Sequence, residues 1–125
     1  MSTRGEEHVV GTVDDFPPGT HRVVTVGRRE VGVFNIDGVL HALPNVCPHQ
    51  AGPLCEAAST TGTLEIELNE DGTRSFTWAH EGEIVRCPWH GLEFHVPTGR
   101  CLAFPKLSVR SYEVVVDGSR VVLRR

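Results

Sequence analysis

The segment CPWHG at residues 87–91, together with CPH at residues 47–49, decides how this chain folds. Each segment places one cysteine and one histidine within a short turn. A soft thiolate beside a borderline imidazole, repeated once in the chain, is typical of a metal centre and rare in a packed core. We therefore interpret the two segments as halves of one site, with four candidate ligands: Cys47, His49, Cys87 and His90.

The order of these ligands indicates which kind of centre they form. A mononuclear zinc finger usually takes two cysteines from one turn and two histidines from another. Here each turn supplies one of each, in the order C-x-H and then C-x-x-H. This order suits two metal ions side by side, with both sulfurs on one ion and both nitrogens on the other. A structural zinc site, or buried cysteines and surface histidines without metal, are the alternatives.

The two segments resemble the motif of the Rieske [2Fe-2S] ferredoxin family, which is C-x-H, a variable spacer and C-x-x-H. The resemblance spans about residues 8–123. It implies one [2Fe-2S] cluster per chain, with Cys47 and Cys87 as thiolate ligands and His49 and His90 as neutral ligands near the surface, where they form the port for electrons. Because two imidazoles make the cluster less negative than two thiolates, its potential lies above that of a four-cysteine ferredoxin.

The residues beside the second ligand pair predict the position within the Rieske potential range. High-potential members resemble Cys-Pro-Cys-His-Gly-Ser, with a disulfide between the two loops and a serine that donates to a sulfide. This chain has Trp89 and Leu92 at those places. The resemblance therefore implies a potential at the low end of the range, about -150 mV.

Composition and charge restrict the class of protein. A chain of 125 residues fits one domain, and we expect residues 1–125 to form it. The 16 acidic residues outnumber the 12 basic ones, which argues against nucleic acid as a partner. Apolar runs are far shorter than the roughly 20 residues that span a bilayer, so no membrane partner is expected. No apolar segment precedes residue 8, and four cysteines suit metal chemistry, so we expect a cytoplasmic protein.

Short alternating segments separated by Gly, Pro and Asp predict an all-β fold of antiparallel sheets. Asp37-Gly38 lies between two apolar runs and predicts a type I′ hairpin turn, and Asp117-Gly118 predicts a second turn. We expect a cluster-binding subdomain at about residues 45–105 and a base at 8–44 and 106–123. The expected strands are 9–13, 21–26, 31–36, 39–43, 83–86, 92–96, 100–104, 107–116 and 120–123.

The spacer between His49 and Cys87 has 37 residues, about twice the usual spacer of ferredoxin-like members of the family. The segments on both sides of the turn at residues 69–72 alternate between apolar and polar side chains, which predicts an inserted β-hairpin over residues 63–79. This hairpin is either a surface decoration or an element that docks a partner.

The remaining cysteines and histidines are not expected to bind metal. Cys55 is predicted to be a buried free thiol, and a disulfide with Cys101 is the alternative. The other histidines have no cysteine at ligand spacing and are expected to be ordinary surface or edge residues: His8, His21, His41, His80 and His95.

The resemblance implies an electron carrier without catalytic residues of its own. Its expected partners are a flavin-dependent reductase and a terminal oxygenase. The alternatives are a small subunit of a larger oxidoreductase, such as an assimilatory nitrite reductase, and a structural zinc-binding module.

Overall fold

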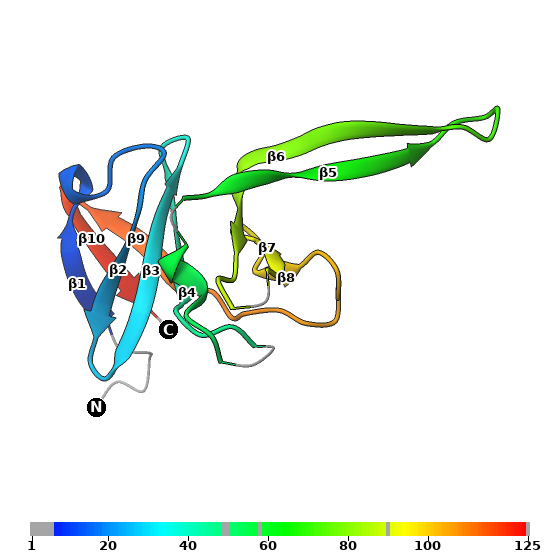
Figure 1. Cartoon of the computed structure of the whole chain (residues 1–125). Helices are drawn as coiled ribbons and strands as arrows, with labels where there is room; N and C mark the ends of the chain where they lie inside the picture. The colour runs from blue at the N-terminus through cyan, green and yellow to red at the C-terminus, as the bar shows by residue number, and fades with distance from the viewer. Residues whose placement is uncertain (1–6, 49–50, 58, 90, 125) are drawn as a thin grey trace.

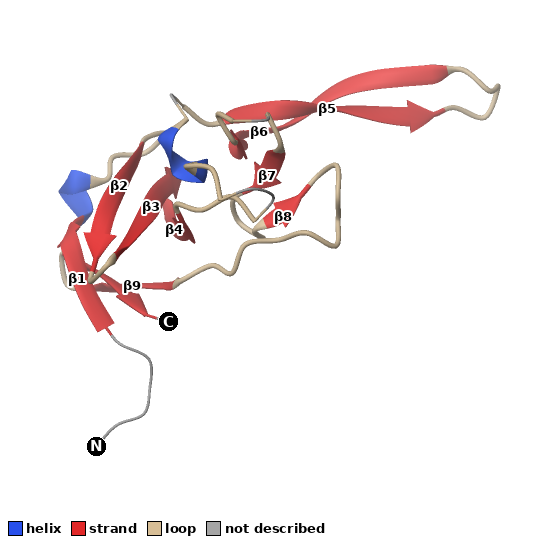
Figure 2. Cartoon of the chain, turned by 60° about the horizontal axis from the view of Figure 1, so that its bottom comes forward, coloured by secondary structure: helices blue, strands red, loops and turns tan. Residues whose placement is uncertain are grey.

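The computed structural model describes residues 7–48, 51–57, 59–89 and 91–124. Within these ranges the chain forms ten strands in three antiparallel sheets, with two short 3-10 helices and no α-helix. The predicted all-β fold is therefore confirmed. Figure 2 shows that loops connect most of the strands. In the part of the chain described, no helix is long and apolar enough to cross a membrane.

Two three-stranded sheets lie at one end of the molecule (Figure 1). The first has the order β1-β10-β9 and the second the order β2-β3-β4. The strands are β1 (Glu7–Thr12), β2 (His21–Val26), β3 (Arg29–Ile36), β4 (Val39–Pro44), β9 (Glu113–Asp117) and β10 (Arg120–Arg124).

The Asp37-Gly38 turn between β3 and β4 has the predicted form. Ile36 pairs with Val39, so the turn contains two residues, and their φ angles are 53° and 90°. Positive φ at both positions defines the type I′ turn, whose twist matches that of the strands. The second Asp-Gly turn is shifted by one residue from the prediction. Asp117 still pairs with Arg120, so Gly118 is the first turn residue.

Strand β3 separates two hydrophobic cores. Val31 and Val33 pack in the core of the first two sheets, together with Phe16. Phe34 lies in a second core with all four cysteines of the chain. Because side chains alternate along a strand, one strand can face both cores. This arrangement connects the base of the molecule directly to the surroundings of the ligand loops.

The third sheet carries the second ligand loop and has the order β5-β6-β7-β8. Its strands are β5 (Thr61–Leu68), β6 (Arg74–Arg86), β7 (Glu93–His95) and β8 (Arg100–Cys101). The far ends of β5 and β6 form a hairpin that extends away from the rest of the molecule (Figure 1). The inserted hairpin predicted over residues 63–79 is confirmed. The expected separate strand at residues 83–86 is instead the end of the long β6.

Two predicted strands were wrong in extent. Residues 107–112 were expected to belong to a strand, but only β9 (Glu113–Asp117) forms a ladder there. The preceding segment makes isolated bridges, Ser108 with Arg100 and Tyr112 with Ala42. Since its partners change from the third sheet to the second, it cannot form one continuous ladder. The strand expected over residues 100–104 likewise ends at Cys101.

Candidate metal centre

Cys47 and Cys87 begin two turns with the same hydrogen-bond pattern. The Cys47 carbonyl accepts from the Ala51 N–H at 2.7 Å, and the Cys87 carbonyl accepts from the Gly91 N–H at 2.8 Å. The Cys47 N–H donates to the Gly52 carbonyl and the Cys87 N–H to the Leu92 carbonyl. Each cysteine is therefore bonded to the residues four and five positions later, so the same pair of hydrogen bonds closes both turns.

The backbone conformation is also similar at the fourth residue after each cysteine. Ala51 and Gly91 occupy the same position in their turns and have φ angles of 59° and 71°. Glycine adopts this left-handed region freely, whereas a β-carbon is disfavoured there by about 1–2 kcal/mol. Ala51 keeps this conformation because the hydrogen bonds of the first turn require it. The likeness of the turns is thus a property of the backbone, shared by two different sequences.

The two turns meet at Gly52. A β-carbon at this position would lie 3.0 Å from two ring atoms of Trp89 and 3.2 Å from the Cys87 Sγ. Cys47 and Cys87 are both buried, whereas Trp89 is 59% exposed. The absent side chain of Gly52 lets the first turn approach the thiol of the second. A cavity of about 340 Å³ opens beside Cys87, between the second turn and the 3-10 helix η2 (Leu54–Glu56).

Asn45 anchors the far end of the first ligand loop, a role that was not predicted from the sequence. Its buried side chain accepts from the Cys55 N–H at 2.7 Å and donates to Glu56 at 2.8 Å. The loop that begins at Cys47 is therefore closed by a side chain two residues before it. An asparagine beside a predicted ligand loop is a weak signal, because its partner lies ten residues later.

Cys55 and Cys101 are buried free thiols and form no disulfide. Cys55 packs against the backbone of β3, where a β-carbon at Gly32 would lie only 2.4 Å from the Cys55 Cβ. Burial raises the pKa of the Cys55 thiol to about 12. A thiol kept neutral in this way is a poor metal ligand, since the thiolate is the binding form. The prediction that Cys55 is a buried free thiol is confirmed.

The candidate ligands His49 and His90 lie outside the described residues. The structure therefore places Cys47 and Cys87 together and leaves the two imidazoles as predictions from the sequence. The described half of the donor set fits an iron–sulfur centre, because two buried thiols begin matching turns that meet across a glycine.

Comparison with known proteins assigns the family. The sequence model of the Rieske [2Fe-2S] domain matches residues 6–113. Over 119 residues the chain is 30% identical to mouse apoptosis-inducing factor 3. The matched segment covers 94% of this chain but only 16% of that protein. The ferredoxin component of the naphthalene 1,2-dioxygenase/salicylate 5-hydroxylase systems of a Ralstonia species is 28% identical, covering 90% of this chain and 88% of the relative.

A solved structure supports the same assignment. The ferredoxin of carbazole 1,9a-dioxygenase from Nocardioides aromaticivorans IC177 superposes with a TM-score of 0.70 at 28% identity, covering 94% of this chain and 96% of that one. The likeness thus includes the base sheets as well as the ligand turns. The chain belongs to the Rieske [2Fe-2S] domain family, whose cofactor is a [2Fe-2S] cluster.

Proposed function

We propose that this chain is a one-electron carrier that transfers electrons from a flavin-dependent reductase to a terminal oxygenase. We further propose that its Rieske cluster is held by Cys47, His49, Cys87 and His90. An electron carrier of this kind needs no catalytic residue. When bound, the cluster supplies reversible one-electron transfer at a potential set by its mixed ligands. The protein is then a component of an oxidoreductase system and not itself an enzyme.

The observation that carries this proposal is the pair of matching turns that meet at Gly52. Hydrogen bonds at 2.7–2.9 Å fix both cysteine backbones in their turns. Fixed donors lose little conformational entropy on binding, which favours a preorganised centre. The burial of Cys47 and Cys87 also excludes water from the sulfur side.

The surface around the second turn suits contact with a redox partner. Trp89 is 59% exposed, and two atoms of its ring lie against Gly52 at the junction of the two turns, so much of the rest of the side chain meets solvent. Exposed aromatic side chains are enriched where proteins bind one another. The side chain of Trp89 thus shields the junction and offers an apolar contact next to the proposed electron port.

The names of relatives support the proposed partners. The Ralstonia relative is a ferredoxin component of an oxygenase system, and it is matched over 88% of its length. A ferredoxin of carbazole 1,9a-dioxygenase is matched over 96%. Cys55 and Cys101 are buried thiols outside any disulfide, which supports a reducing, cytoplasmic location. We keep residues 45–105 as the proposed cluster-binding subdomain, with the base at 8–44 and 106–123, within one domain over 1–125.

Metal analysis tests the cofactor assignment. Protein purified without oxygen should contain iron and acid-labile sulfide in equal amounts, close to a pair of each per chain, and its reduced form should give a Rieske-type electron paramagnetic resonance spectrum. Cys47→Ala and Cys87→Ala should lose the cluster. Cys101→Ala is the matched control, because it removes an equally buried thiol from the same core. One zinc per chain without sulfide would refute the proposal.

Reconstitution tests the partner assignment. The cluster-loaded chain should restore product formation when it is added to a flavin-dependent reductase and a terminal oxygenase, and the Cys87→Ala variant should not. Purification only as a complex with a large nitrite reductase subunit, with no turnover in oxygenase mixtures, would assign the chain to that alternative.

A further inference from the structure

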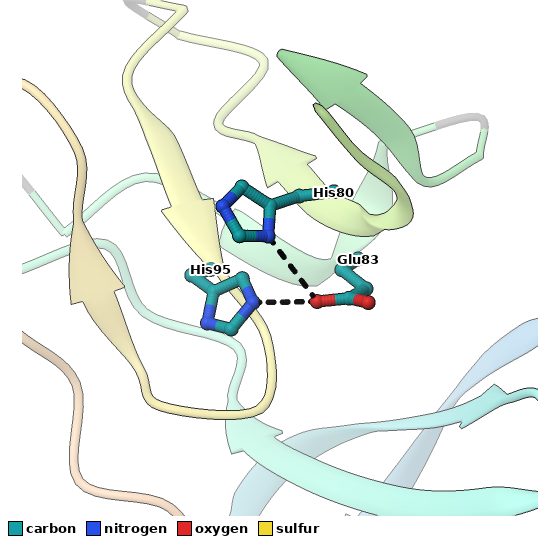
Figure 3. A group of neighbouring side chains, drawn as sticks. All are labelled: His80, Glu83 and His95. Carbon is teal, nitrogen blue, oxygen red and sulfur yellow. Dashed lines mark hydrogen bonds and ion pairs between the residues drawn. The ribbon is translucent and has the colours of Figure 1, made fainter. Parts of the chain in front are cut away.

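Three side chains outside the ligand turns converge at the root of the projecting hairpin: His80, Glu83 and His95 (Figure 3). The first two belong to β6 and the third to β7. One potential ligand atom from each lies within 4.8 Å of the other two. Both histidines were expected from the sequence to be ordinary surface or edge residues, so this group is an unexpected finding.

A bulge in β6 brings these side chains together. Thr61 of β5 pairs with Ile84 and Thr63 pairs with Ala79, so residues 80–83 of β6 lie opposite the single residue Gly62. His80 has a φ of 56° within this insertion. A bulky residue rarely adopts positive φ, and bulges of this kind redirect side chains at strand ends. The inserted residues turn His80 and Glu83 toward His95 on the neighbouring strand.

The distances suit a metal ion. The Glu83 Oε1 lies 2.7 Å from the His95 Nε2 and 3.6 Å from the His80 Nδ1. Ligand atoms bound to zinc at about 2.0–2.2 Å are roughly 3.3 Å apart in a tetrahedral site. The two observed distances lie on either side of this value, so small side-chain rotations would accommodate an ion.

Each imidazole is also oriented by a second partner through its other nitrogen. The His80 Nε2 contacts the Glu65 Oε1 at 2.9 Å, and the His95 Nδ1 contacts the Thr98 Oγ1 at 3.0 Å. Histidines that bind metals nearly always have such a partner, which fixes the tautomer and the direction of the ring. This pattern distinguishes the group from a chance cluster of polar side chains.

We propose that His80, Glu83 and His95 form a second metal site, for a divalent transition-metal ion such as Zn²⁺. Two imidazoles and one carboxylate are a donor set that zinc accepts, with its remaining position open to water. His80 is exposed, so an ion can enter from solvent. The bound ion would link β6 to β7 and thus hold the root of the hairpin. This site is separate from the proposed cluster ligands and does not depend on the cluster.

Calorimetric titration of the cluster-loaded protein with Zn²⁺ alone tests the proposal. Wild-type protein should bind one equivalent, and His80→Ala and Glu83→Gln should weaken binding by at least about 100-fold because each removes a direct ligand. Glu65→Gln should weaken it by about 10-fold, as expected for an outer partner. His8→Ala, which changes a histidine of β1, should bind as wild type does.

The same samples show which result overturns the proposal. It fails if wild-type protein binds no zinc, if His80→Ala binds as tightly as wild type, or if zinc uptake is matched by iron loss from the cluster. Since the His80 side chain is 41% exposed, its replacement leaves the fold intact and this variant decides the question. A shift of the melting temperature by Zn²⁺ in wild type, absent in His80→Ala, provides a second readout.

A second feature of the hairpin is an exposed apolar face on β5 and β6. Five large apolar side chains on β5 and β6 are between 56% and 75% exposed: Leu64, Ile66, Leu68, Phe76 and Trp78. Leu64 pairs with Trp78 and Ile66 with Phe76, so the five side chains share one face. In the described structure nothing covers this face.

From this face we infer that two copies of the chain associate through their hairpins. Homodimer interfaces are more apolar than those of transient complexes, and all five side chains of this face are apolar. The hairpin pairs residues 63–68 of β5 with residues 74–79 of β6. This ribbon would contribute roughly 500 Å² per copy, so a symmetric pair would bury about 1,000 Å², the size at which an interface becomes biologically plausible. Face-to-face packing would leave the acidic Glu65 and Glu67 on the outer surfaces, away from the partner.

Light scattering during size-exclusion chromatography of the cluster-loaded protein tests this inference. Wild type should elute as a dimer, and Phe76→Glu should shift it to a monomer by weakening association at least about 100-fold. Thr77→Glu adds the same charge to the opposite face and should remain a dimer. A monomeric wild type overturns the inference, and so does equal behaviour of the two variants. A monomer in which only Phe76→Glu loses turnover with an oxygenase would assign the face to that partner.

Discussion

Replacing Gly52 with alanine isolates the contact between the two ligand turns. The φ of Gly52 lies outside the left-handed region, so the backbone accepts alanine without strain. The new β-carbon would lie 3.0 Å from two atoms of the Trp89 ring and 3.2 Å from the Cys87 Sγ, whereas ordinary contacts begin at 3.4 Å. The Trp89 ring and the thiol must therefore move apart by roughly 0.2–0.4 Å.

The expected cost follows from this displacement. Overpacking by one methyl group costs about 1–3 kcal/mol, and we expect about 1–2 kcal/mol because the exposed Trp89 ring can shift. For a domain of this size that corresponds to a melting temperature lower by about 4–8 °C. The iron and sulfide content of freshly purified Gly52→Ala should also fall, since the Cys87 sulfur is displaced from its position.

A double-mutant cycle with Trp89→Ala separates this contact from general damage to the loop. The second substitution should recover about half of the Gly52→Ala effect, because it removes two of the three close contacts. Gly91→Ala is the matched control. It costs about 1–2 kcal/mol through its positive φ, but among the described residues its β-carbon would meet the Arg86 side chain alone, at 3.8 Å. Trp89→Ala should not rescue it. Full cluster content and an unchanged melting temperature in Gly52→Ala would refute the proposed meeting of the turns.

Three further predictions concern the core and the potential. Gly32→Ala should destabilise the protein by about 3 kcal/mol, because the new β-carbon would lie only 2.4 Å from the Cys55 Cβ. Adding Cys55→Gly should restore most of this stability. Equal melting temperatures of the single and double variants would contradict the prediction. Since burial raises the pKa of Cys55 from 9.0 to about 12, its contribution to stability is complete below pH 9.0 and is lost as pH rises toward 12. Denaturant unfolding should therefore show wild type losing roughly 1.4 kcal/mol more than Cys55→Ala between pH 8 and 10, and parallel curves would exclude this effect. The wild-type midpoint potential should be about -150 mV. Leu92→Ser should raise this potential by about 40 mV, because the new hydroxyl can donate one hydrogen bond of about 1 kcal/mol to the cluster. A potentiometric titration measures both values.

The parts of the fold that depend on local chemistry could be predicted from the sequence. The Asp37-Gly38 turn requires two residues that tolerate positive φ, and these two supply them. The hairpin on β5 and β6 follows from strict alternation on both sides of a turn. Segment 107–112 could not be predicted in this way, because its apolar and polar residues fit a strand but its pairing partners belong to two different sheets.

The same distinction applies to the residues of the candidate site. Cys47 and Cys87 stand out because the motif itself carries their spacing, whereas Asn45 and Gly52 act through contacts that no short spacing encodes. The same limit applies to His95, whose partner Glu83 lies 12 residues earlier on another strand. Alternation reveals that a strand has an apolar face, but not what covers that face.

The two proposals on the hairpin have a common physical basis. A two-stranded ribbon by itself is at best marginally stable in water, so this one requires support from elsewhere. Its root is held by the contacts of Glu83 with His80 and His95, which a bound ion would strengthen. Its far end has cross-strand pairs and the hydrogen bonds of its turn but an exposed apolar face, and a partner against Phe76 would supply the missing burial. If both proposals hold, hydrogen exchange at the hairpin should slow when Zn²⁺ is added, and more so in the dimer than in Phe76→Glu. Unchanged exchange at the root on adding Zn²⁺ would show that the ion does not support the ribbon.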